Sequence, residues 1–230
     1  PVNNNNDNPR IFLKSILKPL KGLEAVFEYT FDKNIYDYHW YTGQYDYTTI
    51  QGGSSKSFVD DYLRKYKQHT NYNAINVYAT YSKKFGDHNF KVMAGFNQES
   101  SYQETLDAYS YNQAVIDVPA MGSGTGTIKA TDSYSEYAVR GGFFRVNYNY
   151  QDKYLLEVNG RYDGSSKFPK SSRFGFFPSV SAGWQIAQEK FMESTRNWLD
   201  GLKIRASYGV IGNQNVNPYT FTPTMSVSNK

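Results

Sequence analysis

The chain has 230 residues, a formal net charge of +4 at pH 7 and no cysteine. The absence of cysteine excludes a disulfide framework and thiolate chemistry. The small positive charge, without a run of Lys or Arg, gives little support to nucleic-acid binding.

Hydropathy and aromatic content point in different directions. The mean hydropathy is −0.68, and no apolar run approaches the about 18 residues of a membrane helix. However, 17% of the residues are aromatic, including 22 Tyr and 15 Phe. A membrane β-barrel exposes apolar side chains only at alternate positions and has aromatic girdles at both interfaces. The composition therefore fits such a barrel as well as a soluble, Tyr-rich β-sandwich.

The N-terminal quarter predicts two strands between polar segments. Residues 1–9 are rich in Asn, which predicts a loop, and residues 11–18 are predicted to form a strand. Pro19-Leu-Lys-Gly22 is predicted to be a tight turn, because proline and glycine supply the dihedral angles that it needs. Residues 23–32 alternate between apolar and polar side chains and predict a second strand. Residues 34–61 hold several Tyr and a Gly-Gly-Ser-Ser stretch and are predicted to be a loop.

The middle of the chain repeats this arrangement. Strands are predicted at residues 62–82 and 90–96, with a short turn at 83–87 between them. Residues 100–133 are predicted to be a second long insertion, and residues 138–150 to be a further strand.

Three segments near the C-terminus alternate with period two, so each is predicted to be a strand with one apolar and one polar face. A short turn at 151–153 precedes them, residues 188–201 are expected to form one or two helical turns, and residues 219–227 are a candidate ninth strand. The three apolar faces consist of Tyr154, Leu156, Val158, Gly160 and Tyr162; of Val180, Ala182, Trp184 and Ile186; and of Leu202, Ile204, Ala206, Tyr208 and Val210.

The connections between these predicted strands are unequal at the two ends. Those at 19–22, 83–88 and 151–153 are short, whereas those at 33–61, 100–133 and 164–172 are long. Short turns at one rim and long loops at the other are typical of outer-membrane barrels. The pattern therefore favours an antiparallel up-and-down sheet of about eight strands.

Four motifs in residues 161–214 resemble the SusC/RagA family of TonB-dependent outer-membrane transporters, in order and spacing. They are Arg161-Tyr-Asp-Gly-Ser-Ser-Lys-Phe168, Phe174-Gly-Phe-Phe-Pro-Ser-Val-Ser-Ala-Gly-Trp184, Glu189-Lys-Phe-Met192 and Leu202-Lys-Ile-Arg-Ala-Ser-Tyr-Gly-Val-Ile-Gly-Asn-Gln214. Weaker similarity extends to residues 144–154 and 19–23. We expect the signature positions to be structural; they are Asp163, Gly164, Ser165, Ser166, Phe168, Pro178, Gly183, Trp184, Gly209, Gly212 and Asn213.

The resemblance implies an all-β fold, in which this chain is about eight strands of a transmembrane barrel of ~22 strands around a plug. Nothing in residues 1–230 resembles the plug domain or the N-terminal TonB box. We therefore expect residues 1–230 to be a partial barrel domain, which should not transport by itself.

The resemblance also implies a function, TonB-dependent import of oligosaccharides or peptides across the outer membrane of a Gram-negative bacterium. The implied partners are a SusD-like surface lipoprotein that acts as a lid, the TonB–ExbB–ExbD complex, which acts through parts outside this chain, the outer-membrane lipid and the substrate. No nucleic acid, cofactor or metal is implied, and no enzymatic activity.

Four charged residues are predicted to share the inner, polar face of the wall. Arg161 and Asp163 lie two positions apart and are interpreted mainly as an ion pair that braces the following turn, with binding of a polar solute as the alternative. Lys203 and Arg205 either set a positive potential in the lumen or pair with carboxylates of a plug or a neighbouring strand.

The aromatic stretch that contains Tyr38, Trp40 and Tyr41 is the remaining candidate for binding. Such rings stack on sugar faces or pack against a protein partner. The alternative is that they pack within their own loop or lie at the lipid interface.

Three other patterns give no support to catalysis. The glycines at 122, 124 and 126 are not followed by a helical pattern, so they do not form a phosphate-binding loop. His39, His69 and His88 lack the spacing of metal ligands. No Ser-His-Asp arrangement is indicated.

Two alternatives remain open from the sequence. The chain could close by itself into an eight-stranded barrel that serves as an anchor or adhesin. It could also be a soluble carbohydrate-binding β-sandwich, in which the apolar face of each strand would be core.

Overall fold

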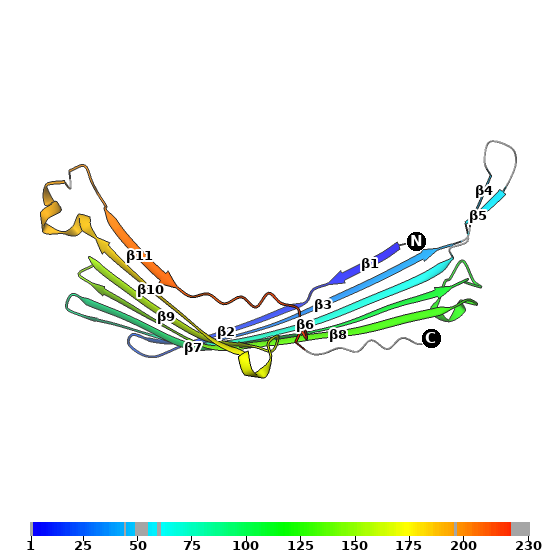
Figure 1. Cartoon of the computed structure of the whole chain (residues 1–230), viewed down its shortest axis with the longest axis horizontal. Coiled ribbons are helices and arrows are strands. Elements are labelled where there is room, and N and C mark those ends of the chain that lie inside the picture. The colour runs from blue at the N-terminus through cyan, green and yellow to red at the C-terminus, as the bar shows by residue number, and fades with distance from the viewer. Residues whose placement is uncertain (1, 44, 49–54, 59–60, 196, 222–230) are drawn as a thin grey trace. The chain divides into compact units, whose positions relative to one another are not determined.

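The computed structural model describes residues 2–43, 45–48, 55–58, 61–195 and 197–221 (Figure 1). In this part of the chain, nine strands form one antiparallel sheet, and two further strands form a separate hairpin. The strands of the sheet are β1 (Val2–Asp7), β2 (Arg10–Leu20), β3 (Leu23–Thr42), β6 (Tyr62–Phe85), β7 (His88–Tyr111), β8 (Ile128–Tyr150), β9 (Tyr154–Ser165), β10 (Phe174–Gln185) and β11 (Lys203–Gly209). The hairpin consists of β4 (Tyr45–Thr48) and β5 (Ser55–Phe58).

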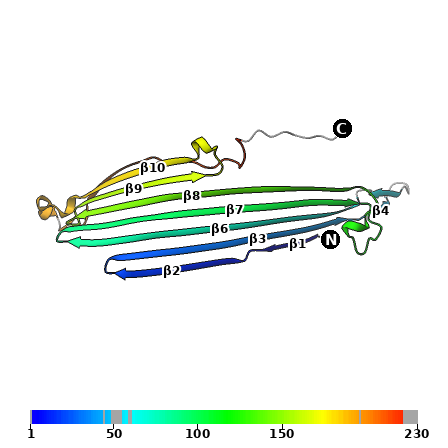
Figure 2. The ribbon, with the colours of Figure 1, turned by 90° about the horizontal axis from the view of Figure 1, so that it is seen from below.

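The order of strands across the sheet is β1-β3-β6-β7-β8-β9-β10-β11, and β2 also pairs with β3 (Figure 2). From β2 to β11 each strand of this sheet pairs with the next strand of the sheet along the chain, which confirms the predicted up-and-down arrangement; β1 is the exception, because β1 and β2 both pair with β3. Within the described residues β11 pairs only with β10, so the sheet is open. The pairing of first and last strands that a standalone eight-stranded barrel would need is not found in this part of the chain.

The chain divides into two compact units. Unit 1 consists of Pro1–Ile11, Phe31–Tyr72 and Ser101–Glu136, and unit 2 of Phe12–Thr30, Asn73–Ser100 and Tyr137–Lys230. The long strands β3, β6, β7 and β8 each contribute residues to both units.

Few apolar side chains are buried in this sheet. Among the described residues the buried apolar ones are Val26, Leu63, Ala74, Ala108, Val139 and Ala187. Large apolar side chains remain exposed instead, for example Phe176 at 54% and Tyr208 at 73%. A soluble sandwich buries the apolar faces of its strands between two sheets, and the described residues show no second sheet that covers these side chains.

Two segments that the sequence predicts to be loops are strands. Residues 2–7 form β1, which pairs with β3 from Ile35 to Trp40. The prediction of a loop at 1–9 was wrong. These Asn-rich residues have few apolar side chains and therefore show no strand pattern, but their backbone pairs with that of β3. Likewise, β3 continues to Thr42, so the predicted loop at 34–61 begins later.

The predicted insertion at 100–133 is also shorter than expected. Strand β7 continues to Tyr111 and β8 begins at Ile128, which leaves a connection of residues 112–127 with one short 3-10 helix, η1 (Met121–Ser123). Polar side chains occupy both faces in residues 98–107, so the contrast between an apolar and a polar face is weak. The aromatic residues Tyr102, Tyr109 and Tyr111 favour the extended conformation.

The predicted short connections are confirmed. Short 3-10 helices, η3 (Ile186–Gln188) and η4 (Lys190–Thr195), lie within or beside the predicted helical turns at 188–201. A third, η2 (Lys170–Ser172), lies between β9 and β10. Most of the candidate ninth strand at 219–227 lies outside the described residues.

Gly22 in the turn between β2 and β3 has a positive φ of 86°, and a Cβ there would overlap the carbonyl oxygen of Ser82. We expect Gly22→Ala to destabilise the protein by about 1–3 kcal/mol, because it adds backbone strain and displaces a neighbouring strand. The measurement is the urea midpoint of unfolding in detergent. Gly86→Ala is the control, since Gly86 has a φ of 54° but open space around it. Equal effects of the two substitutions would contradict the role of the Ser82 contact.

Candidate functional site

The register of strands β8 to β11 in unit 2 separates two faces. Val146, Val158, Val180 and Tyr208 lie opposite one another across the four strands. The neighbouring row consists of Asn147, Glu157, Ser181 and Ser207. Residues opposite one another on paired strands point to the same side of the sheet. One face is therefore apolar and the other polar, as the three period-two segments predicted.

The apolar face carries a row of aromatic side chains close to the short turns. Ring centroids are separated by 4.8 Å between Phe90 and Tyr148, by 6.2 Å between Tyr150 and Tyr154, and by 6.5 Å between Tyr154 and Trp184. This row crosses β7, β8, β9 and β10 and has the position of an interfacial girdle.

A second aromatic contact lies farther along the same face. The rings of Tyr162 on β9 and Phe174 on β10 stack with centroids 5.3 Å apart. Tyr154 and Tyr162 are eight residues apart on β9, which is about 27 Å along a strand. The apolar band of an outer-membrane barrel is about 25 Å tall. At the tilt of about 35–45° that strands have in such barrels, this length of strand spans about 19–22 Å of membrane thickness, so the two aromatic contacts enclose most of the height of such a band.

Glu189, between η3 and η4, fixes the aromatic row to the adjacent turn. Its carboxylate accepts hydrogen bonds from the Tyr154 hydroxyl at 2.6 Å, from Trp184 Nε1 at 3.1 Å and from Lys153 Nζ at 3.3 Å. The hydrogen bond from Tyr154, with those from Trp184 and Lys153, lowers the pKa of Glu189 below its ordinary value. A carboxyl group with a lowered pKa stabilises the fold above its ordinary pKa, and this stabilisation is lost as the pH falls through the lowered pKa.

We therefore expect Glu189→Gln to destabilise the protein at pH 7, and the difference in stability from the wild type to shrink as the pH falls below about 4.5. Urea unfolding at a series of pH values, followed by tryptophan fluorescence, measures this difference. Asp200→Asn, at an exposed position of the same connection, is the control and should show no such dependence. A difference that stays constant with pH would contradict the assignment.

The polar face of unit 2 holds the predicted pair Arg161 and Asp163. The Arg161 guanidinium makes two hydrogen bonds to the Asp163 carboxylate, of 2.9 and 3.0 Å, and lies over the ring of Phe143 at 5.4 Å. Gly141 lies against the same carboxylate, where a Cβ would overlap it. The two side chains thus bond to each other, which agrees with the bracing interpretation. An open cavity of about 920 Å³ lies on this face, lined by Arg145, Arg161 and Asp163 among others.

Lys203 and Arg205 of β11 share the polar face, because Lys203 lies opposite Gln185 and Arg205 opposite Gly183. Arg205 donates a hydrogen bond of 3.5 Å to the Ser181 hydroxyl. Within the described part of the chain neither side chain forms an ion pair, so both cations remain available to a partner or to the solvent.

The signature residues make contacts within the sheet and its turns. Ser166 accepts a hydrogen bond of 2.8 Å from the Ala138 amide, and the Phe168 amide donates one of 3.3 Å to the Ser165 carbonyl. The Pro178 carbonyl accepts from the Val210 amide at 2.9 Å. The ring of Phe174 covers Gly164, and that of Phe177 covers Gly212. Lys203 lies beside Gly183, Ser179 beside Gly209, and Asn213 accepts from the Asn215 amide at 2.8 Å.

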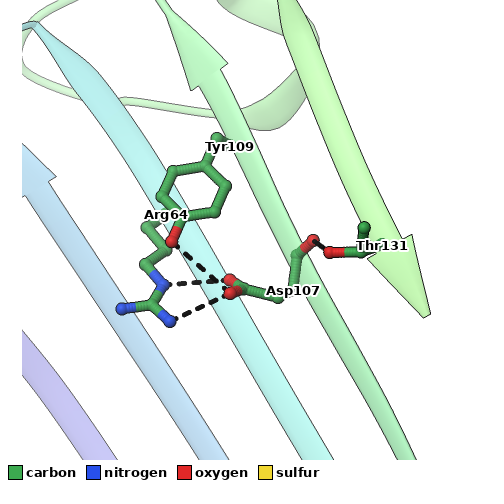
Figure 3. A network of polar contacts seen from close by, with 4 residues as sticks. All are labelled: Arg64, Asp107, Tyr109 and Thr131. Atoms are coloured by element: carbon green, nitrogen blue, oxygen red, sulfur yellow. Dashed lines mark hydrogen bonds and ion pairs between the residues drawn. The ribbon is translucent and has the colours of Figure 1, made fainter. Parts of the chain in front are cut away.

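Unit 1 contains a second polar and aromatic site, centred on Arg64 (Figure 3). The Arg64 guanidinium makes two hydrogen bonds of 2.9 Å to the Asp107 carboxylate on the neighbouring strand. The Tyr109 hydroxyl donates to the same carboxylate at 3.4 Å, and Thr131 of β8 donates to the Asp107 carbonyl at 3.5 Å. Burial raises the pKa of Tyr109, as does the negative charge of Asp107, so the hydroxyl keeps its proton at neutral pH.

Tyrosine rings surround this ion pair. The guanidinium carbon lies 5.8 Å from the ring centroid of Tyr38, 5.7 Å from that of Tyr66 and 5.3 Å from that of Tyr109. Further rings adjoin them, with centroids 5.9 Å apart for Tyr36 and Tyr66 and for Tyr62 and Tyr109. We call this group the tyrosine cluster; it consists of Tyr36, Tyr38, Tyr62, Tyr66, Tyr109 and Tyr111.

The three aromatic residues that the sequence predicted as candidates for binding, Tyr38, Trp40 and Tyr41, do not lie on one face of the strand. Tyr38 belongs to the tyrosine cluster, and Trp40 stacks on Tyr38 with centroids 6.4 Å apart. Tyr41 takes the alternate position of β3, so it points to the opposite face of the strand. Its hydroxyl is buried without a hydrogen-bond partner among the described residues, and the pKa of Tyr41 is raised by burial and by nearby Asp61. Arg64, Asp107 and Tyr109 were missed because residues 100–133 were expected to be an insertion.

The connection at 112–127 is anchored by the buried side chain of Gln113. Its amide nitrogen donates to the carbonyl and the hydroxyl oxygen of Ser110, both at 3.0 Å. Its Oε1 accepts from the Ser123 hydroxyl at 2.7 Å and from the Ala120 amide at 3.2 Å. The backbone amide of Gln113 donates to the buried carboxylate of Asp61 at 3.0 Å. The base of this loop is therefore ordered, although its apolar tip is exposed at Ile116 and Val118.

The two-faced sheet, with aromatic rows at both margins of its apolar face, defines the class of protein as a wall of a transmembrane β-barrel. A family described as TonB dependent receptor-like, beta-barrel matches residues 2–230. The chain belongs to this family, whose members are outer-membrane transporters rather than enzymes.

Individual relatives agree with the family. The chain is 32% identical over 179 residues to TonB-dependent receptor P3 of Formosa agariphila, covering 77% of this chain and 18% of the relative. It is 30% identical over 174 residues to TonB-dependent receptor SusC of Bacteroides thetaiotaomicron, covering 73% of this chain and 16% of the relative. The chain thus spans less than a fifth of the length of these relatives.

Solved structures confirm the fold. The structure of the RagAB peptide transporter matches with a TM-score of 0.86 at 19% identity, over 100% of this chain and 25% of that chain. The RagAB peptide importer in the open-open state matches with a TM-score of 0.84 at 20% identity. None of the helices in the described residues has the length and apolar character of a membrane span.

Proposed function

We propose that this chain is part of the barrel wall of an outer-membrane importer that takes up oligosaccharides or peptides, driven by the TonB–ExbB–ExbD complex. The observation that carries the proposal is the two-faced sheet, in which an apolar face between aromatic rows backs onto a polar face. The similarity to SusC and to the RagAB peptide transporter supports this role.

In this proposal residues 1–230 form a partial barrel domain, and the plug and TonB box belong to parts outside this range. A SusD-like lipoprotein covers the end with the longer loops. The polar face lines the lumen, where Arg161 and Asp163 brace the wall and Lys203 and Arg205 contribute positive charge. The wall itself has a passive role, because it spans the lipid and shapes the space through which the substrate passes.

The standalone barrel and the soluble sandwich receive less support. Within the described residues the first and last strands do not pair, and the large apolar side chains are exposed rather than packed between two sheets.

The experiment is uptake of fluorescent oligosaccharides and peptides by cells of the source bacterium. Strains that lack the gene for the full-length receptor, or the gene for TonB, are compared with the parent strain. We expect both deletion strains to lose uptake of the same substrate. The receptor gene supplied in trans should restore this uptake in the receptor deletion. Two results would overturn the proposal. One is uptake that persists in the strain without TonB, and the other is a receptor deletion that abolishes the uptake of none of the substrates.

A further inference from the structure

We infer that the tyrosine cluster is a binding site for an uncharged oligosaccharide. The inference rests on the proposed function and deepens it, because it selects one of the two substrate classes and names the residues that bind it. All residues that carry it lie in unit 1.

The charge at the centre of the cluster is already neutralised. Nε and Nη2 of Arg64 each donate a hydrogen bond of 2.9 Å to one carboxylate oxygen of Asp107. A bidentate pair of this kind satisfies the carboxylate and fixes the plane of the guanidinium. A carboxylate from a peptide terminus or from a uronic acid would have to compete with Asp107 for Arg64. The centre of the site therefore offers little to a charged ligand, and the cation at the margin of the cluster, Lys129 Nζ, lies over the ring of Tyr111, 5.5 Å from its centroid.

The rings of the cluster are held in place before any ligand binds. Arg64 lies within 6 Å of the ring centroids of Tyr38, Tyr66 and Tyr109. The rings of Tyr109 and Tyr111 stack with centroids 6.4 Å apart, and both lie on β7. Side chains fixed on strands lose little conformational entropy when a ligand binds.

The tyrosine side chain has the chemistry that a sugar ligand needs. Each ring offers an apolar surface, and each hydroxyl can both donate and accept a hydrogen bond. A sugar has the same combination, since its C–H groups form apolar patches and its hydroxyls both donate and accept. Six tyrosines on one face, with Trp40 stacked beside Tyr38, therefore suit a ligand that carries many hydroxyls and no charge. The rings occur on β3, β6 and β7, so the site extends across three strands and suits several sugar units.

The cluster also lies far along its strand from the short turn. Arg64 lies 21 residues before the end of β6 at Phe85, where the short turn begins. A membrane strand needs about 9–11 residues to cross the lipid. The stretch of β6 between Arg64 and the short turn is therefore about twice as long as a membrane strand needs.

The test uses the purified full-length receptor in detergent and an array of neutral hexasaccharides (malto-, cello-, xylo- and mannohexaose), hexagalacturonate and unlabelled pentapeptides. We expect a neutral glycan to bind, Tyr38→Ala to weaken that binding at least tenfold, and Tyr38→Phe to weaken it less. Tyr208→Ala is the matched control, because Tyr208 is an exposed tyrosine on the apolar face, and it should leave binding unchanged. Heat-modifiable migration on gels verifies that each variant is folded.

A further variant tests the neutralised charge directly. Asp107→Asn should leave the Arg64 guanidinium without its carboxylate, so we expect binding of hexagalacturonate to increase relative to the neutral glycan. If Asp107 only stabilises the fold, Asp107→Asn should leave the preference between hexagalacturonate and the neutral glycan unchanged.

Three results would overturn the inference: neutral-glycan binding that Tyr38→Ala leaves unchanged, binding of only peptides or hexagalacturonate, or no binding to the array. Uptake in cells separates this failure from that of the proposed function. If peptides enter in a TonB-dependent manner and neutral glycans do not, the inference fails and the proposed function stands. If nothing enters in a TonB-dependent manner, the proposed function itself fails.

Discussion

Replacing Val158 with Arg should destabilise the full-length receptor in a lipid bilayer by about 2–4 kcal/mol, the cost of a basic side chain on the lipid face at the middle of the membrane. Val158 lies on the apolar face of β9, midway between Tyr154 and Tyr162, in register with Val146 and Val180. Urea unfolding in phospholipid vesicles, followed by tryptophan fluorescence, measures the change.

Asn147→Arg is the matched control, since it adds the same side chain on the other face of the neighbouring strand. Asn147 lies opposite Glu157, so the new guanidinium would lie in the aqueous lumen beside a carboxylate. We expect its effect to stay within about 1 kcal/mol, as for a solvent-exposed ion pair. Equal destabilisation by the two substitutions would contradict the assignment of the faces.

Replacing Gln113 with Ala should loosen the connection at 112–127 while the sheet remains folded. The substitution removes the four side-chain hydrogen bonds that join Gln113 to Ser110, Ala120 and Ser123. Each such bond contributes about 1 kcal/mol, and a buried group left without a partner costs more. We therefore expect local opening to become easier by about 2–4 kcal/mol.

Hydrogen exchange with mass spectrometry on the full-length receptor measures this effect. Amides of residues 114–123 should exchange at least tenfold faster in Gln113→Ala, and amides of β9 and β10 should not change. Asp117→Ala, an exposed substitution in the same loop, should leave the exchange unaltered. Unchanged exchange in Gln113→Ala would show that the side-chain bonds do not hold the loop.

The sequence predicted the part of the sheet in which each strand has one apolar and one polar face. In β9, β10 and β11 the contrast between the two faces is strong, as in the row of Val146, Val158, Val180 and Tyr208, and the strands and their orientation follow from it. The sequence failed where this contrast is absent. Residues 34–42 and 98–111 are mainly polar or aromatic, and Ile35, Leu106 and Ala108 are their only aliphatic residues, so period two gives no continuous apolar face to detect.

One ion pair of the candidate site could be predicted from the sequence, and the other could not. The pairing of Arg161 with Asp163 could be predicted, because both lie two residues apart on one strand. The pair formed by Arg64 and Asp107 joins side chains 43 positions apart in the sequence, and it depends on the register of β6 and β7. That register cannot be derived while half of β7 is expected to be a loop. Tyr41 lies on the opposite face from Tyr38 and Trp40 because side chains alternate along a strand. This could not be predicted while residues 34–61 were expected to be a loop.

We expect β9 to be a membrane strand with its even-numbered side chains in lipid and its odd-numbered ones in an aqueous lumen. Residues 1–230 contain no cysteine, so, once any cysteine elsewhere in the full-length receptor is replaced by serine, single cysteines at positions 155–162 can be spin-labelled one at a time in bilayers. Collision with oxygen, which concentrates in lipid, should be greatest at 156, 158 and 162. Collision with a water-soluble nickel chelate should be greatest at 157, 159 and 161. Accessibility without a period of two, or with the two parities exchanged, would contradict the account.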